Sequence, residues 1–465
     1  MNKRIKQFFF RSMISKTMKN LIIFYAVLAI LNLIGLGFIN AKYILLADII
    51  LIALTVFYYY PAIGLYLMIF LYPFSGWQLT SGSINLPYAD LVALMLFIAV
   101  ALKIIVKIIV GEETFKNILK NNFPGALFAG LFFLAGLLSL VNVDFRLSSI
   151  KYLLRPMVFF YLMFIVLPYY VIKDKAVFKR ALYVFLFSGL VVAGLGFLSV
   201  VFPQGANINL HRAVPYALAG FNLIVGNQNA IAEILIAVLP LAMLLFLLTD
   251  KIKERGWYVL AGIFFCLIIL MTFSRAGWLA LMVELLVLYF IQRRHLVNRY
   301  VLAAIIFVVL LSLLILYFAI WQNIDWIQTS NANRLLLSHI SLAAFWEHPF
   351  IGHGPNTFQD VVARTFVYTV EFGEPLDSHG FVQKLMVETG AFGLLTFLLL
   401  LGSIAKKIWR EFTAAKSGRV RTMISCFIVL LFGLVVFEFF STSYYLAAMW
   451  LPLGVALVGS KLYAK

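Results

Sequence analysis

Long apolar stretches alternate with short polar loops along almost the whole chain. Each stretch is about as long as the roughly 17–25 residues that a helix needs to cross the ~30 Å hydrocarbon core of a membrane. The pattern predicts an all-α polytopic membrane protein with about 14 spans, or about 12 if residues 21–74 contribute one crossing and a re-entrant piece. The stretches are 21–39, 43–74 (two short spans meeting near Tyr58–Pro61), 88–110, 123–141, 152–172, 181–202, 223–248, 257–273, 276–291, 300–320, 385–405, 422–440 and 444–460.

One long polar segment, Trp321–Gln383, interrupts this pattern. Within it, apolar positions recur near helical spacing over residues 333–347, which predicts an amphipathic helix able to lie on a membrane surface. The chain therefore divides into a basic N-terminus (1–20), a transmembrane bundle (21–320), this large loop (321–383) and C-terminal transmembrane helices (384–465).

Composition agrees with the membrane class. Hydrophobic residues make up 64% and charged residues 12% of the chain, and the mean hydropathy is +1.01. A soluble domain has roughly 25% charged residues, so membrane lipids are the expected surroundings. Both cysteines, Cys266 and Cys426, lie inside apolar stretches, and the chain therefore has no disulfide framework.

The basic residues indicate how the chain is oriented. They concentrate in loops that fall on one side when the spans are counted, and basic loops stay in the cytoplasm. Both termini are therefore expected in the cytoplasm and the polar segment outside. This placement accounts for the formal charge of +18 without a nucleic-acid partner. The main basic loops are Lys173–Arg180, Asp250–Arg255, Gln292–Arg299 and Lys406–Arg421.

Two arginines stand at the edges of apolar stretches on the predicted outer side. Arg275 lies between the stretches 257–273 and 276–291, and Arg334 opens the amphipathic part of the polar segment. A guanidinium at a membrane boundary either snorkels, as Arg275 could beside Trp278, or faces a polar cavity. Its planar fork matches phosphate oxygens, so both arginines are candidate phosphate clamps. For Arg334, a solvated helix start is the alternative.

His379 is the candidate general base, because an imidazole titrates near pH 6.5 and can accept a proton from a hydroxyl. Asp377, two residues earlier, could orient the ring. A glycine-rich turn, residues 351–358 with His353 and Gly354, could present N–H groups to phosphate. It lacks the strand–loop–helix context of a nucleotide site, so a plain turn is the alternative. The histidine spacing does not indicate a metal site, and no HExxH motif occurs.

Four pieces of the sequence, in the same order, resemble the O-antigen ligase and Wzy-type polysaccharide polymerase family. The family signature is a histidine, usually followed by Asn, Ser or Gln, then nine residues and Gly-x-x-Gly. Here His379 is followed by Gly380, the nine residues Phe381–Thr389, and Gly390–Gly393. The other pieces are Ser274–Trp278 (SRAGW), Arg334 with Trp346 and His348–Phe358, and Gly220–Ala230, where Gln228 replaces the usual proline before Asn229.

This resemblance implies a membrane glycosyltransferase of GT-C-like architecture in the bacterial cytoplasmic membrane. It would take a glycan from undecaprenyl diphosphate on the outer face and join it to an acceptor hydroxyl, with no metal or other cofactor. His379 would deprotonate the acceptor, while Arg275 and Arg334 hold the leaving diphosphate. The implied partners are the donor, a glycan or lipid-glycan acceptor, a flippase and a chain-length regulator. Further substrate-binding candidates are Arg212, Asn229, Asp377, His353 and Gly354.

Other functions stay open on the sequence. Ligase and polymerase share this chemistry and differ in the acceptor, which could be a lipid A core, a growing polymer, a teichuronic-type chain or a protein glycan. A transporter or flippase of lipid-linked oligosaccharide is the alternative class, because ionisable residues inside spans can mark a substrate path. A structural scaffold would not account for arginines at span boundaries. The in-span ionisable residues are Asp48, Asp90, Glu233, Glu284 and Glu438.

Overall fold

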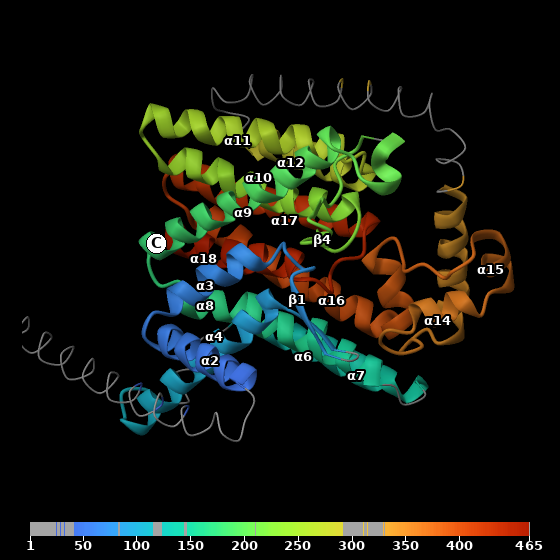
Figure 1. Ribbon diagram of the computed structural model, residues 1–465, viewed down its shortest axis with the longest axis horizontal. Helices are drawn as coiled ribbons and strands as arrows, with labels where there is room; N and C mark the ends of the chain where they lie inside the picture. The colour runs from blue at the N-terminus through green and yellow to red at the C-terminus, as the bar shows by residue number, and fades with distance from the viewer. Residues whose placement is uncertain are drawn as a thin grey trace, which may run out of the picture.

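The computed structural model is a bundle of apolar helices with a smaller helical cap beyond one end (Figure 1). It describes residues 25, 28, 32, 41–81, 84–114, 123–143, 147–209, 211–291, 310, 314, 329 and 331–464. The predicted span over 21–39 and the one over 300–320 lie outside the described residues, apart from isolated positions. The predicted total of about 14 spans therefore stays a prediction.

Within the described ranges, eight helices are long and apolar enough to cross a membrane, or up to nine if a bent pair is one span. This confirms the all-α polytopic class. The span that contains α7 and α8 covers Leu147–Val171. The others are α4 (Tyr88–Ile109), α9 (Lys175–Val201), α10 (Gln228–Leu248), α11 (Ile252–Met271), α16 (Phe381–Ala414), α17 (Gly418–Phe440) and α18 (Ala447–Ala464).

Four more predicted spans are helices of other kinds. α2 (Ala41–Tyr59) and α3 (Pro61–Leu71) form the bent pair, with 117° between their axes. Pro61 begins α3, because proline has no N–H to continue the preceding helix. The predicted break near Tyr58–Pro61 is thus observed. α6 (Ala126–Ser139), extended by η1 (Leu140–Asn142), and α12 (Arg275–Ile291) are shorter apolar helices.

The span Leu147–Val171 is irregular. It begins five residues before the predicted Tyr152, as α7 (Leu147–Leu154), and passes into the π-helical segments η2 (Arg155–Phe159) and η3 (Tyr161–Val166) before α8 (Leu167–Val171). Pro156, in the first turn of η2, removes one backbone donor from the α-helical ladder. A π-helical stretch inside a helix is frequently associated with a functional site.

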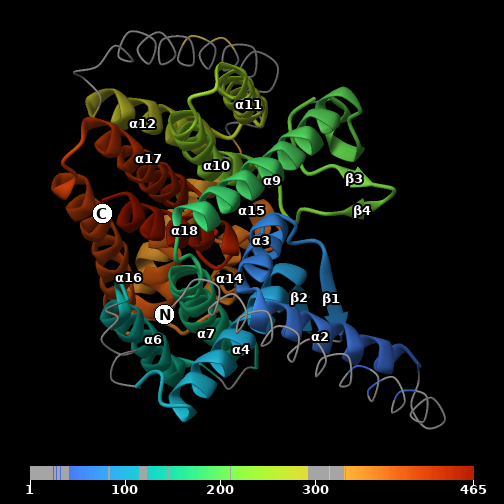
Figure 2. The same cartoon turned by 90° about the vertical axis from the view of Figure 1, so that its left-hand side faces the viewer.

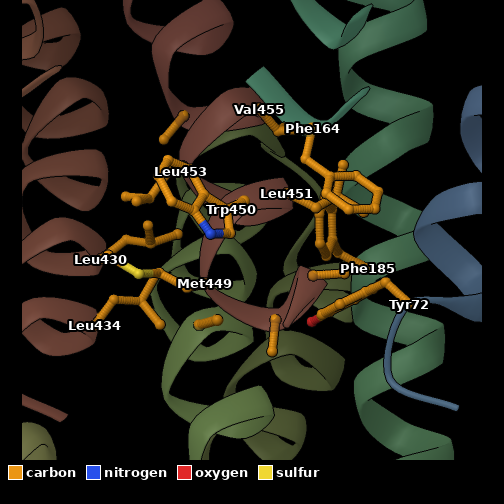
Figure 3. Close-up of a cluster of buried hydrophobic side chains, with 14 of the residues drawn as sticks. Tyr72, Phe164, Phe185, Leu430, Leu434, Met449, Trp450, Leu451, Leu453 and Val455 are labelled. Atoms are coloured by element: carbon orange, nitrogen blue, oxygen red, sulfur yellow. The ribbon is translucent and has the colours of Figure 1, made fainter. Parts of the chain in front are cut away.

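α18 is the most enclosed of these spans: every residue from Ala447 to Ser460 is buried, whereas most residues of α4 are not. Figure 2 shows it inside the bundle, with α11 and α12 on one side and α2 and α4 on the other. Trp450 of α18 is 1% exposed and packs among Leu430, Leu434 and Met449 (Figure 3). Gly454 allows α18 to approach η3, since a Cβ there would lie 1.8 Å from the Phe164 carbonyl oxygen.

Two basic residues make contacts at the end of the bundle away from the cap. Arg419, at the start of α17, donates to Asp250 after α10 at 3.1 Å. Lys461, near the end of α18, donates to the Tyr169 hydroxyl of α8 at 2.6 Å.

The opposite end carries two short antiparallel hairpins, β1 (Gln78–Ser81) with β2 (Ile84–Pro87) and β3 (Ala217–Leu218) with β4 (Phe221–Asn222). η4 (Gly205–Asn209) precedes the second hairpin.

The cap consists of a helix over residues 331–347, α14 (Phe358–Ala363) and α15 (Phe366–Phe372). The first of these is the predicted amphipathic helix. Its apolar face packs in a hydrophobic cluster with α14, α15 and the beginning of α16, so this face contacts protein rather than lipid. The cluster is Leu337, Ile340, Ala344, Phe358, Val362, Tyr368 and Val387.

Candidate active site

A tight turn between α11 and α12 places Arg275 at the first position of α12. Phe273 has a positive φ of 55°, which reverses the chain. Ser274 caps α12, since its Oγ accepts a hydrogen bond from the Gly277 N–H at 3.1 Å. A Cβ on Gly277 would lie 2.8 Å from Ala232 of α10, so a larger residue would push the two helices apart. The SRAGW motif is therefore a compact helix start that fixes Arg275 at the cap end of the bundle.

Asn229 supports this turn from the neighbouring helix. It lies in the first turn of α10, where Asn227 is the N-cap and accepts from the Asn229 N–H at 2.9 Å. The Ser274 hydroxyl donates to Asn229 Oδ1 at 2.7 Å. The structure thus joins two of the motifs recognised in the sequence. The predicted substrate contact of Asn229 stays a prediction.

Arg334 reaches the same region from the cap. Arg275 donates to Asn331 at 2.6 Å, one helical turn before Arg334. The Arg334 side chain is half-buried, and its Nε is buried with no hydrogen-bond partner in the described part of the chain. Burial lowers the pKa of Arg334, and the positive charge of Arg275 lowers it further. The two guanidinium groups therefore repel each other, and an anion between them would relieve that repulsion.

His379 lies in the loop before α16, close enough to both arginines to respond to their charges. Burial lowers its pKa from 6.5 to about 4; Arg334 and then Arg275 add to this shift, while Asp377 opposes it. The imidazole is therefore neutral at pH 7. No described residue makes a hydrogen bond with its ring. Arg275 and Arg334 thus both lie close enough to His379 for their charges to lower its pKa.

Asp377 is held by a buried lysine rather than by His379. Lys384 of α16 is 3% exposed, and its Nζ lies 2.6 and 2.7 Å from the two Asp377 oxygens. The Tyr445 hydroxyl also donates to Asp377, at 3.3 Å. Lys384 further pairs with Glu388 at 3.6 Å. The carboxylate of Asp377 therefore acts on His379 through space, and its predicted role in substrate binding stays a prediction.

Gly380 departs from the residue types usual after the signature histidine, and the structure gives a steric reason. A Cβ at this position would lie 2.3 Å from the Phe439 carbonyl oxygen at the end of α17. Ser378 reinforces the same contact, because its hydroxyl lies 2.8 Å from that of Thr442 and its carbonyl accepts from Thr442 at 2.7 Å. The loop that carries His379 is therefore fixed on both sides to the α17–α18 turn.

α16 is broken at Gly390, where φ is 64°. The turn 351–358 fills the break: the N–H groups of His353 and Gly354 donate to the carbonyls of Val387 and Glu388 at 2.8 and 2.9 Å. In return, the N–H groups of residues 391 and 392 donate to the carbonyls of residues 349 and 350 at 2.8 and 3.2 Å. The signature glycine therefore belongs to a backbone junction between the span and the cap.

The side chains of the turn 351–358 also contact the cap and the bundle. His353 Nε2 lies 2.8 Å from the Ala344 carbonyl and 3.6 Å from Glu347. A Cβ on Gly354 would lie 1.8 Å from a methyl group of Val143. His353 and Gly354 thus hold the cap against α16 and α6, and their predicted substrate contacts stay predictions. In the described ranges, no group of three or more His, Cys, Asp or Glu residues could hold a metal ion.

Arg212 follows η4, in the loop between α9 and α10. Its backbone is fixed by the Asn207 side chain, which donates to the Arg212 carbonyl at 2.8 Å and accepts from its N–H at 3.2 Å. Burial lowers the pKa of Arg212. Its charge is not among those that shift the pKa of His379, so its predicted substrate contact stays a prediction.

Sequence reasoning missed the residues that surround Asp377. These are Lys384 and the tyrosines whose rings it faces, with Nζ 5.4 Å from the Tyr152 ring and 5.0 Å from the Tyr445 ring. A lysine in the first turns of an apolar span is itself a signal, because a membrane charge is costly unless it is paired. The tyrosines carry no comparable signal.

The bundle, its cap and this cationic site define a multi-pass membrane protein with a candidate active centre at one end. The O-antigen ligase family model, Wzy_C, matches residues 259–398, which confirms the resemblance seen in the sequence over this part of the chain. The matched stretch runs from α11 into α16 and includes Arg275, Arg334 and His379. No curated protein matches the chain.

Proposed function

We propose that the protein transfers a glycan from undecaprenyl diphosphate to an acceptor hydroxyl at the extracytoplasmic face of the bacterial cytoplasmic membrane. The family supports membrane glycan ligation or polymerisation in general. One observation carries the finer proposal: Arg275 of α12 donates to Asn331, one turn before Arg334, and the charges of both arginines lower the pKa of the nearby His379. A base beside fixed cations suits a reaction in which a hydroxyl is deprotonated while an anionic group leaves.

In this mechanism His379 accepts the proton of the acceptor hydroxyl, and the acceptor oxygen attacks the anomeric carbon. The bond between that carbon and the diphosphate oxygen breaks, and its electron pair leaves with the lipid diphosphate. Arg275 and Arg334 stabilise the negative charge on the leaving group, as preorganised donors do at developing charges. A single displacement inverts the configuration at the anomeric carbon. No step in this scheme uses a metal ion.

Donor binding would also prepare the base. In the free protein, burial together with the charges of Arg334 and Arg275 lowers the pKa of His379 to about 4, which makes it a weak base. A diphosphate between the guanidinium groups offsets their charge, so the pKa of His379 rises towards its ordinary value. The base therefore becomes stronger when the donor is in place.

The test is a transfer assay with the full-length protein in nanodiscs and an undecaprenyl-diphosphate glycan as donor. The acceptor panel contains a lipid A core glycolipid, the free donor repeat, a teichuronic-type oligosaccharide and a glycoprotein, each with and without a chelator. We expect His379→Ala, Arg275→Ala and Arg334→Ala each to lower kcat/KM by about 10²-fold or more. The matched controls His339→Ala and Arg364→Ala replace exposed cap residues and should stay within about threefold of wild type.

Transfer at the wild-type rate by His379→Ala would refute the proposed base. Movement of intact donor across a bilayer without glycosidic bond formation would instead favour the transporter alternative. Local partners hold two of the five in-span acids that motivate that alternative: Asn32 donates to Asp48 at 2.7 and 2.9 Å, and Arg155 donates to Asp90 at 2.9 Å.

A further inference from the structure

A cavity of about 550 Å³ opens beside the candidate active centre. It lies between the β2–α4 junction, the α7–η2 span, the turn 351–358 and the loop between α17 and α18. Its volume is within the roughly 300–1,000 Å³ typical of ligand pockets. The lining residues that matter here are Asn85, Tyr152, Arg155, Phe159, Asn356 and Tyr445. Arg275, Arg334 and His379 are not part of this lining.

A preorganised guanidinium faces this cavity. Arg155 Nε and Nη2 lie 2.9 and 2.7 Å from the same oxygen of Asp90. The Asp90 side chain is 2% exposed, whereas that of Arg155 is 37% exposed. The carboxylate therefore fixes the plane of the guanidinium, while part of the group stays accessible from the cavity. Arg155 begins the π-helical segment η2, whose Pro156 and Phe159 also line the cavity.

The aromatic side chains that line the cavity are also held in place by neighbouring residues. The Tyr152 hydroxyl lies 2.7 Å from that of Tyr444, and the Lys384 ammonium lies over the rings of Tyr152 and Tyr445. Amide side chains of Asn85 and Asn356 lie at the edges. Flat aromatic faces beside amides and a guanidinium suit a sugar, because its ring has apolar C–H faces and a rim of hydroxyl groups.

The cavity meets the candidate active centre at Tyr445. This residue lines the cavity, and its hydroxyl donates to Asp377 at 3.3 Å. Asp377 in turn is among the charges that act on His379. The guanidinium groups assigned to the diphosphate come from α12 and the 331–347 helix, which contribute nothing to the cavity lining. The cavity and the diphosphate site thus approach the imidazole through different elements.

We propose that this cavity binds the sugar rings of the acceptor, with Tyr152 and Tyr445 as stacking surfaces and Arg155, Asn85 and Asn356 as hydrogen-bonding groups. The inference rests on the proposed transferase function and assigns the second substrate of that reaction to its own site. An acceptor bound there directs a hydroxyl past Tyr445 towards His379, while the donor occupies the side of Arg275 and Arg334.

The experiment uses the full-length protein, the same donor, and the acceptor from the panel above that gives the fastest wild-type transfer. Ser148→Trp fills the cavity from an exposed lining position, and Asn356→Gly removes an amide where the positive φ of 63° favours glycine. Leu147→Trp is the matched control, since Leu147 is exposed on the same helix but does not line the cavity. The measurements are KM for acceptor and donor, kcat and the unfolding temperature.

We expect Ser148→Trp to raise the acceptor KM by about tenfold or more and Asn356→Gly by about threefold, with the donor KM within about twofold of wild type. Leu147→Trp should change neither constant. The inference fails if folded Ser148→Trp and Asn356→Gly keep the wild-type acceptor KM, or if the donor KM rises instead. If the wild-type protein transfers to no acceptor, the proposed function itself fails, and this inference fails with it.

Discussion

Two histidines of the polar segment, His353 and His379, show what separates a structural residue from a candidate catalyst. His353 is 9% exposed; its N–H donates to Val387, and its ring nitrogen lies 2.8 Å from the Ala344 carbonyl. His379 has no hydrogen bond to its ring from any described residue, and two guanidinium groups act on it. In the sequence both are lone histidines near glycines. Their contacts, rather than their residue type, distinguish them.

The same difference extends to their surroundings. Around His353, backbone donors and acceptors of the turn and of α16 satisfy one another across the break at Gly390. Around Arg334, a buried Nε has no partner in the described ranges, and the positive charge of Arg275 adds to the effect of burial in lowering the pKa of Arg334. A satisfied junction holds the cap in place, whereas a buried guanidinium nitrogen without a partner in the described ranges is suited to bind an anion.

The largest expected effect separates the two histidines directly. His379→Ala should lower transfer by about 10²-fold or more with little change in unfolding temperature. His353→Ala should lower the unfolding temperature, because it removes a buried hydrogen bond that joins the turn to the 331–347 helix. Parallel measurement of kcat and thermal unfolding for both variants checks this. A raised donor KM with unchanged stability in His353→Ala would instead support its predicted substrate contact.

The next largest effect is a loss of stability when Gly352, in the turn that packs against α16, is replaced. Gly352 and Gly373 have similar positive φ values, 70° and 79°. A Cβ on Gly352 would lie 2.5 Å from the Glu388 backbone, whereas Gly373 has nothing within 4 Å. Gly373→Ala should therefore cost about 1–3 kcal/mol for its backbone conformation, and Gly352→Ala about 1–3 kcal/mol more because packing strain is added. Denaturant unfolding compares the two. Equal losses would contradict the close packing of turn and span.

A smaller effect is expected on the pH dependence of kcat/KM when Arg334 loses its charge. In the free protein, burial, Arg334 and Arg275 lower the pKa of His379 to about 4, so the base is lost only as pH falls through about 4. Arg334→Gln removes one positive charge, which raises the pKa of His379 and moves the acid limb of kcat/KM to higher pH, by up to roughly one unit. A pH profile of kcat/KM measures this limb. A limb that stays in place or moves to lower pH would contradict the proposed coupling.

The smallest effect is expected at Asn331, which accepts a hydrogen bond from Arg275 at 2.6 Å. Asn331→Ala should loosen the guanidinium without removing its charge and lower kcat by roughly three- to tenfold. Ala332→Ser, on the exposed neighbouring position, is the control. Unchanged kcat in Asn331→Ala would show that Arg275 is held by its other contacts.

Much of the fold could be predicted from the sequence because span length and the effect of proline are local properties. The apolar runs mark the helices, and Pro61 marks the bend between α2 and α3. The π-helical course of η2 and η3 was not predicted, since it depends on how the whole span packs. The amphipathic helix was predicted, but the protein surface that covers its apolar face comes from residues 358–387.

The candidate site was predictable only in part, for the same reason. Arg275, Arg334 and His379 were found because charge or titration at a membrane boundary needs an explanation. The pairing of Asp377 with Lys384 and Tyr445 required the fold, since Tyr445 is 68 positions away in the chain. The reason for Gly380 likewise appears only when the end of α17 lies against it.

The break in α16 also bears on how substrates arrive. Four backbone hydrogen bonds cross between the turn and the span, from residues 353, 354, 391 and 392. A cap held in this way cannot swing aside like a lid without losing all of them, at a cost of several kcal/mol. We therefore expect a lipid-borne substrate to enter sideways, between helices and within the plane of the bilayer, while the cap stays bound to α16.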